Sequence, residues 1–306
     1  MHYNAVVNIP SVGKDARIGS VFNHIFSIMF QTEETDTSCG NKIVWDFSQC
    51  SFLHPFFLGA LSILRRQYGD RVCLRGIKTA ISHYLDTVFF ESPLSIHSED
   101  NEELIWRQYY TKSYLPICMF HPYDDSSIKA QELVQRAIRE QLSSDNKVHG
   151  ILSLLLGELI DNITEHSKSE EGFLFSQSWP SEKKLYILIS DTGRSIYASY
   201  AYDERYSKLL TNLESSALVL ALRGKSTKDR PESENRGYGI SKSRKLIVDG
   251  LGGEFFILSG CAFVRYDRNG EVVADLPENY RWNGTVILLT IPTEIPKDFN
   301  IYKYIC

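Results

Sequence analysis

The sequence lacks long hydrophobic runs, paired cysteines and a secretory signal. Its longest apolar stretches, residues 151–156 and 217–222, are far shorter than the ~20 residues that cross a bilayer, so we expect no contact with a membrane. The first ten residues, MHYNAVVNIP, contain no basic segment followed by an apolar one. The six cysteines show no CxxC spacing, which argues against a zinc site or a redox pair and favours free thiols in the cytoplasm.

The sequence also gives no indication of the clustered basic face that nucleic-acid binding needs. It has 33 Lys and Arg against 38 Asp and Glu, a net charge of -5 that predicts a solvated acidic surface and no nucleic-acid partner. Hydrophobic residues make up 43% and charged residues 23%, which is ordinary for a globular protein. A length of 306 residues permits two domains.

Alternating strand and helix patterns occupy the first hundred residues. The apolar segment IVWDF at residues 43–47 predicts a strand, and residues 54–66 have apolar positions at helical spacing. A second strand is expected at 71–75 and a second helix at 79–90, so this part should form a small α/β layer. The acidic stretch SEDNEE, residues 98–103, is the best candidate for a linker.

The C-terminal part has longer elements. Two helices are expected first, an amphipathic one at 126–141 and a more apolar one at 147–166. Residues 194–234 are mostly polar, with one helical patch at 213–222, and a further helix should run from 239 to about 248. Strands are expected at residues 172–176, 185–190, 254–258, 262–267 and 285–291.

A carboxylate and a carboxamide share one face of the second of these helices. Glu158 and Asn162 lie four residues apart in the segment ELIDNITEH. An amide oxygen is a suitable ligand for Mg²⁺, and a carboxylate can orient or deprotonate water. A surface helix often carries such a pair, so the pair alone is weak evidence of a site.

Three further motifs follow in the chain. Asp191-Thr-Gly193 comes directly after an apolar strand, where a carboxylate can accept a hydrogen bond from an exocyclic amine and a glycine leaves room for a flat base. Arg-Gly237-Tyr-Gly239-Ile240 opens a helix, where backbone N–H groups and the helix dipole favour a phosphate. Gly284-Thr285 begins the last strand. Each motif alone also has a structural explanation, as a turn or a hairpin glycine.

Taken in this order, the four motifs resemble the GHKL ATPase family, which includes histidine kinases, DNA gyrase, heat-shock chaperones and anti-sigma kinases. The resemblance covers residues 116–292, and ELIDNITEHS is most similar to the anti-sigma kinase form. It implies an α/β fold, an α+β two-layer sandwich of GHKL type, that binds ATP between its helical layer and a lid. The lid would be residues 195–235, which is long for the family.

The resemblance also implies roles for individual residues. Asn162 would ligate Mg²⁺, and Glu158 would be the catalytic carboxylate that orients water. Asp191 would bind the adenine amine, with Gly193 beside the ring and Thr285 at the same end. Lys225 lies in the basic run RGKSTK and could reach a γ-phosphate, although a solvated loop is the more common role for any one of these lysines. The residues expected along the phosphates are Gly237, Gly239 and Ile240.

Residues 1–95 resemble a STAS domain, the fold of anti-sigma-factor antagonists. The resemblance rests on KIVWDFSQCSFLHPFFLGALSIL, with Asp46 at the strand end, and on TAISHYLDTVFF. His54-Pro55-Phe56 stands where the family has its phosphorylatable serine, so the usual phospho-switch is missing. Any small α/β domain would explain the same pattern.

Together these patterns predict a STAS-like regulatory domain at residues 1–100 and a GHKL-type domain at 112–294. We expect a regulatory protein that binds ATP and Mg²⁺ and whose lid controls a contact with a protein partner or with its own STAS-like domain. The alternative is an enzyme, either an ATPase using Glu158 as its base or a protein serine kinase. A nucleotide-free scaffold is a third reading, which the intact motifs oppose.

Overall fold

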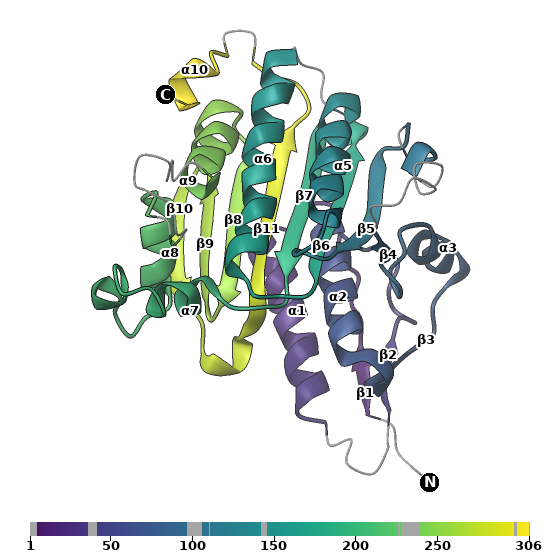
Figure 1. The fold of residues 1–306 in the computed structure, drawn as a ribbon. Helices are drawn as coiled ribbons and strands as arrows, with labels where there is room; N and C mark the ends of the chain where they lie inside the picture. Colours follow the sequence, from purple (N-terminus) through teal and green to yellow (C-terminus); the bar gives the residue numbers. More distant parts are fainter. Residues whose placement is uncertain are drawn as a thin grey trace. The chain divides into compact units, whose positions relative to one another are not determined.

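The chain forms two compact units, residues 1–94 and residues 95–306 (Figure 1). The computed structural model describes residues 5–35, 42–96, 106–109, 111–141, 146–225, 227, 239–296 and 299–305. The linker expected at residues 98–103 therefore lies outside the described part of the chain. Within that part, no helix combines the length and the apolar character that crossing a membrane requires.

Unit 1 is a parallel three-stranded sheet in the order β1-β2-β3 with helical crossovers. The apolar side of α1 packs on α2, and Trp45 Nε1 of β2 donates to Thr32 Oγ1 of α1 at 3.1 Å. The elements are β1 (Val6–Asn8), α1 (Ile18–Glu33), β2 (Ile43–Asp46), α2 (Pro55–Tyr68), η1 (Gly69–Arg71), β3 (Val72–Arg75) and α3 (Thr79–Thr87).

Two polar residues, one at the end of β2 and one before α2, have local structural roles. Asp46 accepts a backbone hydrogen bond from Ser48 and pairs with Arg75 at 2.5 Å, and these two contacts lower the pKa of Asp46 to about 2. His54 is buried and is the N-cap of α2, because its Nδ1 accepts from the backbone N–H of Phe56 at 3.2 Å. His54 thus stabilises the start of α2.

Unit 2 contains most of an eight-stranded sheet in the order β10-β9-β8-β11-β7-β6-β5-β4. From β10 to β5 all neighbours pair antiparallel. The boundary between the units falls within the short strand β4. The strands are β4 (Leu94–Ser95), β5 (Tyr114–Phe120), β6 (Gly172–Trp179), β7 (Lys184–Asp191), β8 (Glu254–Gly260), β9 (Ala262–Asp267), β10 (Gly270–Asp275) and β11 (Trp282–Pro292).

Three helices lie side by side over one face of this sheet, in the order α5, α6 and α9 (Figure 1). The middle helix, α6, contacts both α5 and α9 as well as β7. The helical elements of unit 2 are α5 (Ser126–Gln141), α6 (Asn146–His166), η3 (Pro180–Glu182), α7 (Ile196–Ala201), η4 (Ser207–Leu209), α8 (Ser215–Leu222), α9 (Gly239–Arg244), η5 (Lys245–Gly250), η6 (Glu278–Tyr280) and α10 (Tyr302–Ile305).

The mixed α/β class that the sequence predicts is confirmed, and most expected elements are present with ends shifted by a few residues. The expectation of a single helical patch in residues 194–234 was wrong, because the described part contains both α7 and α8. Ser195 caps α7 by accepting from the backbone N–H of Ala198. The helix expected at 239–248 continues as a π-helical turn, η5, after Arg244.

Candidate functional site

Asp191, the last residue of β7, is a buried carboxylate with two backbone donors. Only 2% of the residue is exposed, and the backbone N–H of Gly193 donates to Oδ1 at 2.8 Å. The backbone of Thr285 is the second donor. An ionised carboxylate can accept about four hydrogen bonds, so it has acceptor capacity left for a ligand's amine.

Strand register places two motif residues, Asp191 and Thr285, and a third residue, Ser259, at one end of the sheet. Ser190 lies opposite Val286, and Thr285 lies opposite Ser259 of β8. Thr285 and Ser259 therefore project from the same face of the sheet as Asp191, since side chains alternate along a strand. The Ser259 and Thr285 hydroxyls are 2.8 Å apart, and Ser259 Oγ also accepts from the backbone N–H of Ile196 at the start of α7.

Ser259 was not predicted as a site residue. It follows an apolar strand, as Asp191 does, but only the pairing of β8 with β11 places it next to Thr285. In a single sequence, a serine at the end of a strand does not indicate a binding site, whereas an aspartate at the end of a strand and followed by Thr-Gly does.

Gly193 allows two backbone turns to touch. A Cβ on Gly193 would overlap the carbonyl oxygen of Ser167 and lie 2.8 Å from Ser169 Cβ. The next residue, Arg194, donates its backbone N–H to the same Ser167 carbonyl. Sequence alone suggests that Gly193 leaves room for a base, but in the structure its missing side chain leaves room for the turn that follows α6.

Gly284 has a similar role on the other side of Asp191. Its φ is +85°, and a Cβ there would overlap the Asp191 carbonyl oxygen and lie 2.6 Å from Asp191 Oδ1. Because one neighbour is a backbone oxygen and the other is a carboxylate oxygen held by the N–H of Gly193, the strand could not approach Asp191 with a larger residue at this position. The close approach brings the N–H of Thr285 to the carboxylate.

Gly284→Ala should therefore destabilise unit 2 by about 2–4 kcal/mol, through overpacking together with a strained backbone. Gly270→Ala is the matched control, because Gly270 has φ +128° but no atom within 4 Å of a Cβ. Urea denaturation would compare the two variants with wild type. An equal loss of stability in both variants would mean that backbone strain alone, and not the contact with Asp191, explains why position 284 needs a glycine.

Glu158 and Asn162 lie on the flank of α6 that faces away from α5. Gly157 and Asp161 mark the α5 side, since a Cβ on Gly157 would be 3.1 Å from Gln131 Oε1 and Gln131 Nε2 donates to Asp161 at 2.6 Å. Glu158 and Asn162 follow Gly157 and Asp161 by one residue each, so they are rotated from the α5 side by about 100° around the helix axis. Glu158 and Asn162 are both half-buried, and α9 contacts α6 on the side away from α5 (Figure 1).

The two helices α6 and α9 run in opposite directions. The residue after α6, Ser167, bonds to the backbone of Arg194, so α6 ends near the Asp191 end of the sheet. The segment after α9 reaches the opposite end, where the N–H of Gly253 donates to Ile247 just before β8 begins.

This antiparallel arrangement puts Gly239 level with Glu158. Ser243 Oγ of α9 donates to the Leu155 carbonyl of α6 at 3.4 Å, which fixes the two helices' relative height. Gly239 is four residues before Ser243, and Glu158 is three residues after Leu155, so both lie about 4.5–6 Å nearer the Asp191 end. The structure therefore brings Glu158 level with the start of α9, and Asn162 lies one helical turn nearer the Asp191 end.

Burial changes the acidity of Asp191. Desolvation raises its pKa from 3.8 to about 7, and the backbone donors Gly193 and Thr285 only partly oppose this rise. Between pH 4 and pH 7 the carboxyl group of Asp191 is ionised in the unfolded chain but protonated in the folded chain. Stability should therefore fall as pH rises from about 4 to 7 and then level off.

The size of this effect should be about 4 kcal/mol, because each pKa unit corresponds to about 1.4 kcal/mol. Asp191→Asn imitates the protonated side chain and should remove the dependence. The measurement is the urea midpoint of wild type minus that of Asp191→Asn across pH 4.5–8.5. A difference that is flat with pH would show that Asp191 titrates normally.

Some predicted site residues are described only in part. Gly237 and most of the expected lid after Lys225 lie outside the described residues. Lys225 has an exposed side chain just beyond the end of α8. Ile240, the second residue of α9, packs against a small cluster built by α7 and α8.

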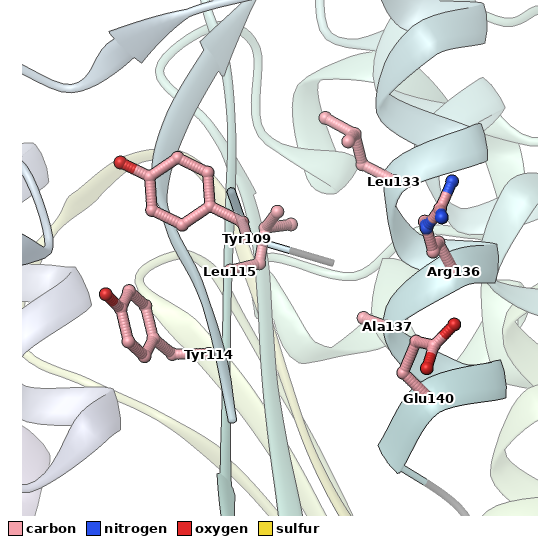
Figure 2. Close-up of a pocket in the computed structure, with 7 residues that line it drawn as sticks. All are labelled: Tyr109, Tyr114, Leu115, Leu133, Arg136, Ala137 and Glu140. Atoms are coloured by element: carbon pink, nitrogen blue, oxygen red, sulfur yellow. The ribbon is translucent and has the colours of Figure 1, made fainter. Parts of the chain in front are cut away.

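A small pocket lies elsewhere in unit 2, between β5 and α5 (Figure 2). The rings of Tyr109 and Tyr114, 6.0 Å apart, lie across from the apolar residues of α5. None of its lining residues belongs to the predicted motifs. They are Tyr109, Tyr114, Leu115, Leu133, Arg136, Ala137 and Glu140.

Comparisons of the chain with models of protein families, with curated proteins and with solved structures find no match.

Proposed function

We propose that the protein binds ATP with Mg²⁺ in unit 2 and that nucleotide occupancy regulates a contact with a protein partner. The observation that carries this proposal is the convergence of four motifs distant in the chain. Asp191 and Thr285 share one end of the sheet, while Glu158 lies level with the start of α9 and Asn162 follows it by one turn of α6. Their order and chemistry are those of the GHKL resemblance.

Asp191 would bind the exocyclic amine of adenine. The carboxylate is buried, is held by two backbone donors, and retains acceptor capacity. Ser259 and Thr285 add two hydroxyl groups on the same face of the sheet. A base with both donors and acceptors on its edge suits this combination.

Asn162 and Glu158 would lie at the phosphate end of the bound nucleotide. An amide oxygen on a half-buried helix flank fits Mg²⁺, which usually takes only one or two protein ligands and completes its shell with phosphate oxygens and water. Bound there, the ion would neutralise phosphate charge. Glu158, one turn before Asn162, would hold a water molecule or accept its proton.

A slow ATPase or a protein serine kinase is the second candidate, because Glu158 lies where a base would be needed. The separate α/β unit at residues 1–94 favours the regulatory function, since a small second module suits a protein contact more than catalysis. The resemblance to anti-sigma kinases and their antagonists points in the same direction.

Calorimetric titration of the full chain with ATP, with and without Mg²⁺, tests the proposal directly. We expect saturable binding that Mg²⁺ strengthens, followed by little phosphate release from the same sample. Absence of ATP binding at millimolar concentration in both conditions would refute the proposed function. Rapid phosphate release by the protein alone would instead favour the enzyme.

Asn162→Ala should remove the effect of Mg²⁺ on ATP affinity, because the helix then loses its only proposed oxygen ligand. ATP titrations at several Mg²⁺ concentrations would measure this. Asn269→Ala is the control, since Asn269 is exposed in the turn between β9 and β10. A response to Mg²⁺ as strong in Asn162→Ala as in wild type would mean that α6 does not hold the ion.

A further inference from the structure

Tyr200 of α7 is a buried tyrosine whose hydroxyl reaches another segment. Only 4% of the residue is exposed, and its hydroxyl donates to the backbone carbonyl of Lys225. Its ring packs in a small apolar cluster with Ala217 and Ala221 of α8. Burial raises the pKa of Tyr200 well above its usual range, so the hydroxyl stays a donor at any working pH.

The other backbone group of Lys225 is fixed as well. Gly224 follows α8 with φ +76°, its N–H donates to Ala221 at 3.0 Å, and the N–H of Lys225 donates to Leu220 at 3.1 Å. This pair of bonds is the Schellman ending of a helix. Both the N–H and the C=O of Lys225 are therefore held, while its side chain is exposed.

The same cluster reaches the start of α9. Ile240, which directly follows Gly239, packs against Tyr200, Ala217 and Ala221. One apolar cluster thus joins the backbone that carries Lys225 to the helix start that the proposed function assigns to the phosphates.

We propose that Tyr200 is a positioning residue, which holds Lys225 so that its ammonium group binds the terminal phosphate of a nucleoside triphosphate. This inference rests on the proposed function and adds to it a selectivity for triphosphate over diphosphate. An ammonium group is a point charge on a flexible stem, so its contribution depends on where the backbone is fixed. Fixing that backbone before binding lowers the entropy lost on binding.

The test compares ATP and ADP affinities of the full chain by calorimetry in wild type, Tyr200→Phe, Lys225→Gln and the double variant. We expect wild type to prefer ATP. Tyr200→Phe should weaken ATP binding about three- to tenfold, the scale of one hydrogen bond, and leave ADP binding within about twofold. The double variant should lose no more ATP affinity than Lys225→Gln, because Tyr200 acts through Lys225.

Tyr197→Phe is the matched control. Tyr197 is on the same helix, and its hydroxyl also donates to a backbone carbonyl, that of Thr211 at 3.0 Å. It should leave the ratio of ATP to ADP affinity unchanged. An equal change in Tyr197→Phe would show that loosening this region, and not the bond to Lys225, causes the effect.

Three results would overturn the inference. In the first, Tyr200→Phe weakens ATP and ADP equally, as a purely structural tyrosine would. In the second, Lys225→Gln, an exposed substitution that should not disturb folding, leaves the ATP preference intact. In the third, wild type binds both nucleotides with equal affinity. Wild type that binds neither nucleotide would overturn the proposed function and this inference with it.

Discussion

Glu158→Ala should lower phosphate release from ATP by about 10²–10⁴-fold, the usual contribution of general-base catalysis, and should leave ATP affinity nearly unchanged. Glu158 is the carboxylate that the motif assigns to water activation, one turn from the proposed magnesium ligand Asn162. Because we propose a regulator, wild-type turnover should already be weak. The variant should then fall to the background rate of ATP in buffer.

Single-turnover phosphate release with excess protein would measure this change, with ATP affinity determined separately on the same preparation. Glu132→Ala is the control, because Glu132 is exposed on α5 and pairs with Lys129 in the same helix at 3.1 Å. If wild type turns over robustly and Glu158→Ala does not, the protein is an ATPase and the regulatory proposal is wrong. If both release phosphate equally, another group activates the water.

Asp191→Asn should weaken ATP binding roughly ten- to hundred-fold, since an unpaired buried polar group costs about 1–3 kcal/mol. The carboxylate already accepts from Gly193 and Thr285. An amide in its place would direct an NH₂ group towards a backbone N–H or towards the amine of the base. Either contact sets two donors against each other.

The raised pKa of Asp191 also predicts that ATP binding is coupled to the release of a proton. The pKa of Asp191 is raised to about 7 in the free protein, and an amine that donates to the carboxylate favours its ionised form. ATP binding at pH 6 should therefore release a proton. Calorimetry in buffers of different ionisation enthalpy would detect the proton, and Asp191→Asn should not release one.

Asp267→Asn is the control for both measurements, because Asp267 also ends a strand of the sheet and accepts from the backbone N–H of Asn269 at 2.7 Å. Its ATP affinity should equal that of wild type. Unchanged affinity in Asp191→Asn would mean that the base is bound elsewhere.

The sequence could predict the elements whose patterns are strong. The bounds of α5 and of β9 agree with the expected ranges, because the first has a regular amphipathic period and the second a short apolar run between turn residues. β10 has no such signal. Its segment GEVVAD is short and largely exposed at the sheet edge, so it is a strand only because β9 pairs with it.

The sequence by itself determined which residue types could serve a nucleotide: a carboxylate after a strand, an acid and an amide on one helix face, and glycines before a helix. Their meeting was decided by tertiary structure, through the pairing of β11 with both β7 and β8 and the antiparallel packing of α6 and α9. The roles of Gly193 and Gly284 were also decided there, because the atoms they make room for come from distant segments. The local sequence determines which hydrogen bonds a residue can donate or accept, but strand register and helix packing determine which groups that residue contacts.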